Sequence, residues 1–140
     1  MTKDVLVRVK GTQYMDGDSD TIEVITNGSC YEKNGKWYVL YEEIMEELNA
    51  VTKNTVKISP DKVEITKKGL IQAQMVYEIG KMNVCNYTTP MGLILLGITT
   101  KDIQFRREED KLNLDIQCAL EMNGQPVSGN RLELTAESRK

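Results

Sequence analysis

The chain has 140 residues, of which 40% are hydrophobic and 28% are charged, a composition typical of an ordinary globular protein and unlike a disordered one. A chain of this length supports one sizeable core, so we expect a single domain over residues 1–140. The net charge of −3 gives phosphates no broad attractive field, which excludes nucleic acid as an expected partner.

The first half of the chain alternates apolar and polar residues, the pattern of a strand with one face in a core. Residues 5–10 show it first, with a valine at every second position. Two further strands are expected at residues 29–33 and 36–43, on either side of Asn34-Gly35. An Asn-Gly pair supplies the positive φ angles of a tight turn, so these two strands are predicted to form a hairpin.

Residues 42–51 depart from this alternation. Ile44, Met45 and Leu48 fall at helical spacing among glutamates, which predicts a short helix. Such a helix would either plug one end of a barrel by covering apolar residues or act as a lid over a cavity. The plug is the favoured interpretation because side chains usually fill small barrels.

The second half continues the strand pattern. Short alternations rich in β-branched residues cover residues 56–58 and 63–66, and the longest alternation covers residues 112–122, before a second turn at Asn123-Gly124. Turn residues divide the whole chain into about ten strands at roughly 8–12-residue spacing, and no segment resembles a crossover helix. The predicted fold class is therefore all-β, an antiparallel meander that forms a barrel or a sandwich.

Five short motifs resemble the bacterial YwiB-like family, a domain of unknown function. They occur in the family's order and spacing, within residues 5–134: Tyr41-Glu42-Glu43, Lys67-Lys68-Gly69, Tyr77-Glu78-Ile79-Gly80, Tyr87-Thr88-Thr89-Pro90-Met91-Gly92 and Asn130-Arg131-Leu132. The resemblance implies a calycin-like, lipocalin-like antiparallel β-barrel and supplies no established activity. Lys67 stands where the family usually has an arginine. Because lysine lacks the bidentate fork of arginine, no shared carboxylate contact is expected there.

Several kinds of chemistry are unexpected because the residues for them are absent. The sequence has no histidine, so the commonest general base is missing and no enzymatic activity is predicted. Cys30, Cys85 and Cys118 are too scattered for a zinc site, and we expect reduced, mostly buried thiols with no metal or cofactor. The longest apolar run, residues 93–98, is too short for a membrane helix, and the N-terminus has no apolar signal region. A cytoplasmic protein without a membrane partner is expected.

The candidate ligand contacts are Tyr41, Glu43, Tyr77 and Tyr87. Tyrosine rings can line a pocket and aim a hydroxyl at a polar ligand group, and a carboxylate turned into a barrel would lie beside them. Strand alternation sends Glu42 and Glu43 to opposite faces, and nothing in the sequence selects which tyrosines face inward. The structural alternative is that the tyrosines bridge core and rim and that both glutamates are solvated.

Two basic tracts, Lys67-Lys68 and Arg106-Arg107, lie at predicted turns. Charge at such positions solubilises the turn or protects an exposed strand edge, so we expect these side chains to be solvated. No aromatic residues interleave with basic ones in the manner of barrels that bind single-stranded nucleic acid. An anionic partner is therefore not predicted.

Two functions remain open from the sequence. The first is a barrel that binds a small apolar or amphipathic ligand, because about eight to ten strands enclose an interior that is either filled or open to one small ligand. The second is a solid barrel that recruits a protein partner, or a second copy of itself, through its outer face or a strand edge. A carboxylate-based enzyme would need two acidic groups in one pocket, for which only Glu42 and Glu43 are candidates.

Overall fold

The computed structural model describes residues 3–139 and consists almost entirely of antiparallel β-structure. The described residues form one ten-stranded sheet and a single 3-10 turn, η1 (Glu46–Leu48). The strands are β1 (Lys3–Met15), β2 (Asp18–Lys33), β3 (Lys36–Met45), β4 (Ala50–Ile58), β5 (Val63–Gly69), β6 (Ala73–Tyr77), β7 (Met82–Thr89), β8 (Gly92–Arg107), β9 (Lys111–Met122) and β10 (Gln125–Ser138).

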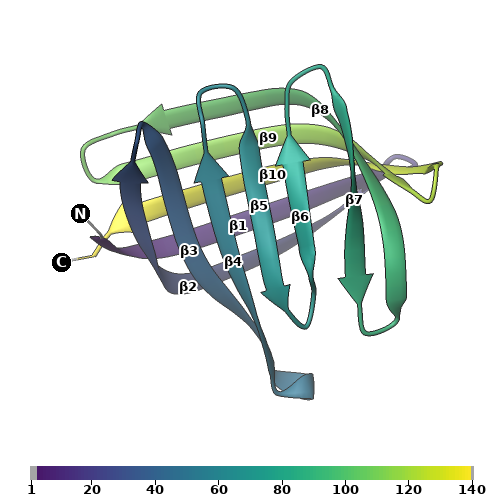
Figure 1. Ribbon diagram of the computed structural model, residues 1–140, viewed down its shortest axis with the longest axis horizontal. Helices are drawn as coiled ribbons and strands as arrows, with labels where there is room; N and C mark the ends of the chain where they lie inside the picture. The colour runs from purple at the N-terminus through teal and green to yellow at the C-terminus, as the bar shows by residue number, and fades with distance from the viewer. Residues whose placement is uncertain (1–2, 140) are drawn as a thin grey trace.

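The sheet curls into a barrel, and β1 and β10, the first and last strands of the chain, pair with each other in the middle of its strand order. In the β1–β10 ladder Val7 lies opposite Ala136, and with one exception every other strand pairs with its neighbour along the chain. Figure 1 shows two layers, in which β3 to β7 cross in front of β8, β9, β10 and β1, with the two chain ends side by side. The predicted antiparallel meander of about ten strands is confirmed, and it forms a nearly closed barrel.

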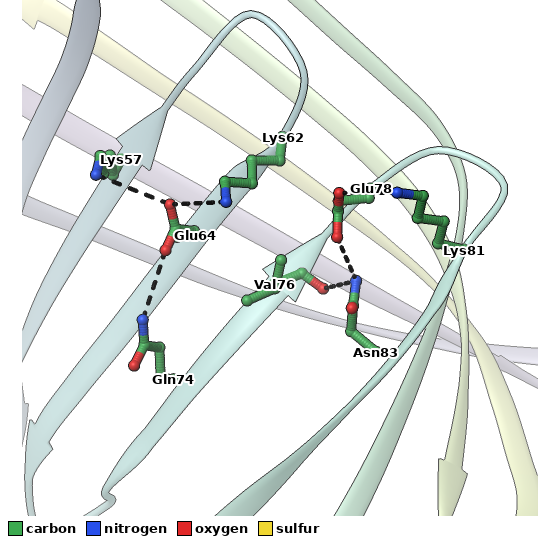
Figure 2. A network of polar contacts seen from close by, with 8 residues as sticks. All are labelled: Lys57, Lys62, Glu64, Gln74, Val76, Glu78, Lys81 and Asn83. Carbon is green, nitrogen blue, oxygen red and sulfur yellow. Dashed lines mark hydrogen bonds and ion pairs between the residues drawn. The ribbon is translucent and has the colours of Figure 1, made fainter.

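The exception is the seam between β6 and β7, where no continuous ladder forms within residues 3–139. At one end of the seam Gln72 and Thr88 exchange two backbone hydrogen bonds, of 3.0 and 2.9 Å. At the other end the Asn83 Nδ2 group donates to the Val76 carbonyl at 3.2 Å and to the Glu78 carboxylate at 3.3 Å (Figure 2). A side chain therefore takes over part of the bonding that a ladder would supply.

The hydrophobic core fills the half of the barrel nearest the chain ends. Strand alternation places it there, since the predicted strand at 112–122 buries Leu112, Leu114, Ile116 and Cys118 on one face. Apolar side chains with almost no exposed surface come from seven strands: Val7, Val39, Val56, Val63, Ile98, Leu114, Ile116 and Leu134. Removing this surface from water is the main favourable term in the folding of the barrel.

Tight turns with positive φ angles join several of the strands. Asn34 and Gly35 have φ angles of 54° and 78°, so the predicted hairpin of β2 and β3 is confirmed. The second predicted turn, Asn123-Gly124, joins β9 to β10. Asp16-Gly17 makes a third turn of this kind, between β1 and β2. Like Asn-Gly, an Asp-Gly pair favours a tight hairpin turn.

The short helix expected over residues 42–51 is reduced to the single turn η1. β3 continues through Met45, and its pairing with β4 extends to the Met45–Ala50 pair, so the ladder prevails over the helical spacing. Ile44 and Leu48 are 68% and 59% exposed, and η1 projects away from the barrel in Figure 1. The interpretation of this segment as a plug is therefore wrong, and it covers no cavity either.

Candidate functional site

The half of the barrel farther from the chain ends holds a cavity of about 370 Å³. Its volume lies in the range of small-molecule sites. Its walls are mostly apolar and come from all strands except β4: Val9, Ile22, Val24, Ile65, Met75, Ile94, Leu96, Leu120, Met122 and Leu132 are among the lining residues. The barrel is thus filled by side chains at one end and hollow at the other.

Gly11 widens this cavity. In the sheet it lies between Ile22 on β2 and Leu132 on β10, both of which line the cavity. A Cβ atom added at Gly11 would meet no atom within 4 Å, so this position opens on empty space. The absence of a side chain here leaves room that a larger residue would occupy.

All four residues predicted as ligand contacts line this cavity. Tyr41 and Glu43 face inward from β3, Tyr77 from β6 and Tyr87 from β7, because alternate residues of a strand share a face. Tyr41 and Tyr77 are buried, Tyr87 is half-buried, and the side chain of Glu43 is 39% exposed. Glu42 is exposed and lies outside the cavity lining, as alternation predicts. That these residues contact a ligand stays a prediction.

Lys67 is the main functional candidate that the sequence reasoning missed. Its side chain is only 17% exposed, and its Nζ group donates to the Glu43 carboxylate at 2.8 Å. The expectation that Lys67 is solvated at a turn is therefore wrong. The alternation of Val63 and Ile65 on β5, extended by one step, would have placed Lys67 on the inner face.

Asn54 on β4 completes this polar cluster. It lies between Tyr41 and Lys67 in the sheet, directly opposite each, and only 1% of its surface is exposed. The Lys67 Nζ group donates to Asn54 Oδ1 at 2.7 Å, and Asn54 Nδ2 donates to the Thr52 carbonyl at 3.3 Å. The lysine is therefore held by a carboxylate on one side and an amide on the other, which fixes where its charge sits.

The hydroxyls of Tyr41 and Tyr87 lie within the electrostatic influence of this cluster. Burial raises the pKa of Tyr41 above its ordinary value, and the negative charge of Glu43 raises it further. The pKa of Tyr87 is also raised, first by desolvation and then by Glu43 and Cys85. Both hydroxyls are consequently protonated at neutral pH and available as hydrogen-bond donors.

Tyr77 lies deeper than the other two tyrosines. Its hydroxyl contacts the Met75 Sδ atom at 3.7 Å, and burial raises its pKa well above the ordinary value. Cys118 lines the same part of the cavity, and burial raises its pKa to about 11, although Lys101 acts in the opposite direction. This end of the cavity therefore presents neutral, weakly polar groups.

Two more polar residues border the cavity from β10. Asn130 accepts a hydrogen bond from the Ser128 hydroxyl through Oδ1 at 2.6 Å. The guanidinium of Arg131 forms a bidentate pair with Asp115, with distances of 3.1 and 2.6 Å. Because its charge is paired with that of Asp115, Arg131 adds little free charge to the cavity.

The remaining candidates from the sequence are the Arg106-Arg107 tract and the three cysteines. Arg106 and Arg107 are exposed at the end of β8, as expected, and the Arg107 guanidinium stacks over the Trp37 ring at 4.7 Å. Cys30 and Cys118 are buried free thiols, and Cys85 is half-buried and free. No group of three or more potential metal ligands occurs in the described part of the chain. Within residues 3–139 no helix has the length and apolar character needed to cross a membrane.

The fold and the cavity together define an up-and-down β-barrel with a lined internal pocket. The sequence matches the model of a family described as a domain of unknown function, DUF1934, over residues 7–134. The chain therefore belongs to this family. The match includes every residue of the polar cluster and all four predicted ligand contacts.

One relative and its structure support this placement. The chain is 26% identical over 133 residues to the uncharacterised β-barrel protein YwiB of Bacillus subtilis (strain 168), covering 95% of this chain and 92% of that protein. The crystal structure of YwiB from Bacillus subtilis superposes with a TM-score of 0.83 at 26% identity, covering 99% of this chain and 94% of the other. The similarity confirms the resemblance found in the sequence and the barrel fold.

Proposed function

We propose that this protein is a binding barrel that holds one small amphipathic ligand in its cavity, in the manner of calycin-like barrels. The observation that carries the proposal is the cavity of about 370 Å³, which has mostly apolar walls and a polar cluster on one side. A site of this composition can bury an apolar body and orient a polar group. In this proposal the ligand is met in the cytoplasm, where the three cysteines stay reduced.

The first experiment is native mass spectrometry of gently purified protein, followed by solvent extraction of any bound molecule. We expect a one-to-one adduct that leaves on denaturation and whose extract contains a molecule with an apolar chain or ring and a polar head. Bare protein that also fails to take up a small apolar probe would contradict the proposal.

A cavity-filling variant tests the location of binding. Gly11→Phe places an aromatic ring in the empty space beside Gly11, whereas Lys10→Phe places the same ring on the exposed side of β1. The neutral fluorescent dye prodan is a suitable probe because its emission shifts to the blue in apolar surroundings. We expect prodan to bind the wild-type protein and Lys10→Phe, and to bind Gly11→Phe at least roughly ten-fold more weakly. Equal binding to all three would place the dye outside the cavity.

A second candidate function is self-association through the outer face of β7 and β8. Met82, Val84, Leu93 and Leu95 are large exposed apolar residues on these two paired strands, and Leu93 is 60% exposed. The patch itself carries no charge, so two copies could face each other without like-charge repulsion in a two-fold dimer. Sedimentation should then show a concentration-dependent dimer that Leu93→Asp abolishes. A monomer at all concentrations would rule this candidate out.

A further inference from the structure

We infer that the cavity selects a ligand whose polar head is uncharged, and that the Glu43–Lys67 pair on the cavity wall makes this selection. The inference rests on the proposed function and adds the chemical class of the ligand. The relevant head groups are alcohols, amides and similar groups that both donate and accept hydrogen bonds without carrying a net charge.

The charged side chains that line the cavity are already paired with opposite charges. Two oppositely charged side chains, Glu43 and Lys67, line it as a direct ion pair with a separation of 2.8 Å. The third charged lining residue, Arg131, is already paired with Asp115. A charged ligand head would therefore be desolvated in the cavity without meeting an unpaired opposite charge, which is unfavourable.

The Glu43–Lys67 pair leaves part of its hydrogen-bonding capacity free. Lysine has three N–H groups, and two of them are used by Glu43 Oε1 and Asn54 Oδ1. One donor of Lys67 therefore remains, and the second carboxylate oxygen of Glu43 has no partner among residues 3–139. A free donor beside a free acceptor matches a head group that accepts one hydrogen bond and donates another.

Tyrosine hydroxyls and apolar side chains surround the Glu43–Lys67 pair. The hydroxyls of Tyr41 and Tyr87, whose protons are retained, can donate to the same head group or accept from it. Beyond them the cavity wall consists of apolar side chains such as Ile65, Leu96 and Leu120. A neutral polar head at the pair and an apolar body along these side chains would satisfy both parts of the cavity.

The test uses four nine-carbon probes that differ only in the head group: nonan-1-ol, nonanamide, nonanoate and nonylamine. Each probe is titrated against the complex of prodan with the wild-type protein at pH 7.5, where nonanoate is anionic and nonylamine is cationic, and the displacement of the dye is measured. We expect the alcohol and the amide to displace the dye at concentrations roughly ten-fold lower than either charged probe. Equal potency of all four, or strongest displacement by a charged probe, would overturn the inference while leaving the proposed function intact.

Charge variants provide the second arm of the test. Glu43→Gln leaves the charge of Lys67 uncompensated, so the potency of nonanoate in displacing prodan should rise at least roughly ten-fold relative to that of nonan-1-ol. Lys67→Gln leaves the charge of Glu43 uncompensated and should raise the relative potency of nonylamine by the same factor. The double variant Glu43→Gln/Lys67→Gln should restore the preference for neutral heads, which serves as the matched control. Single variants without these opposite shifts would contradict the assigned role of the pair. If no dye binds the wild-type protein, the proposed function and the inference fall together.

Discussion

At the scale of single residues, Asn54 shows how the cavity wall is held. It is almost fully buried and satisfies both the lysine of the ion pair and the Thr52 carbonyl. We expect Asn54→Ala to lower the free energy of unfolding by about 1–3 kcal/mol, because it leaves buried polar groups without partners. Urea denaturation measures the change, and Lys53→Ala on the exposed face of β4 should change it by less than about 0.5 kcal/mol. Equal effects of the two variants would contradict this role of Asn54.

Gly69 is a position where only glycine fits. Its φ angle is 148°, and an added Cβ atom would collide with the backbone carbonyl of Val51 and approach Thr52 Cα to 2.8 Å. Backbone atoms cannot move aside as a flexible side chain can, so Gly69→Ala should destabilise the protein by about 2 kcal/mol or more. Gly80→Ala is the comparison, since its φ of 79° is also positive but nothing lies within 4 Å. Thermal denaturation should show the smaller loss for Gly80→Ala, and the reverse order would refute the steric argument.

At the scale of elements, the seam between β6 and β7 is the weakest part of the barrel wall. Figure 2 shows Asn83 reaching from β7 to the Val76 carbonyl and the Glu78 carboxylate. Asn83→Ala removes both hydrogen bonds and should cost about 0.5–1.5 kcal/mol of unfolding free energy. Hydrogen exchange should accelerate in β6 and β7 and remain unchanged in β9 and β10.

Asn86→Ala provides the control for this prediction. Asn86 lies on the same strand but is exposed. The control variant should therefore leave exchange in β6 close to that of the wild-type protein. If both variants accelerated exchange equally, the effect would come from lost strand propensity and not from the Asn83 contacts.

At the scale of the whole molecule, several buried groups make the fold sensitive to alkaline pH. Burial raises the pKa of Cys118 from 9.0 to about 11, and it also raises the pKa of Tyr41 and of Tyr77. The folded protein holds these protons more tightly than the unfolded chain does. The stabilising contribution of Cys118 is therefore complete below about pH 9 and decreases as the pH rises through about 11, and the tyrosines extend the loss to higher pH.

Urea denaturation between pH 8 and pH 11 checks this prediction. The free energy of unfolding should decrease steadily over that interval for the wild-type protein. Tyr77→Phe removes one of the responsible groups and should show a shallower decrease, so that the difference between the two proteins isolates the contribution of Tyr77. Parallel curves would contradict a contribution from Tyr77.

The sequence by itself determined the strands, the main turns and the class of the fold. Alternation and Asn-Gly pairs depend on the local geometry of the backbone, which is why the strand at 112–122 and the turn at Asn34-Gly35 were predictable. The same local rule also predicted that Glu42 and Glu43 lie on opposite faces. One further step of the same alternation on β5 would have placed Lys67 on the inner face.

Only the tertiary structure decided which end of the barrel is hollow and which polar residues meet there. The helical spacing of Ile44, Met45 and Leu48 was overridden because the ladder of β3 with β4 satisfies more backbone hydrogen bonds than one short helix would. Glu43, Asn54 and Lys67 lie on three strands, and their contacts depend on the register of two ladders. Register and barrel closure are set by packing over the whole sheet, so no local pattern in the sequence contains them.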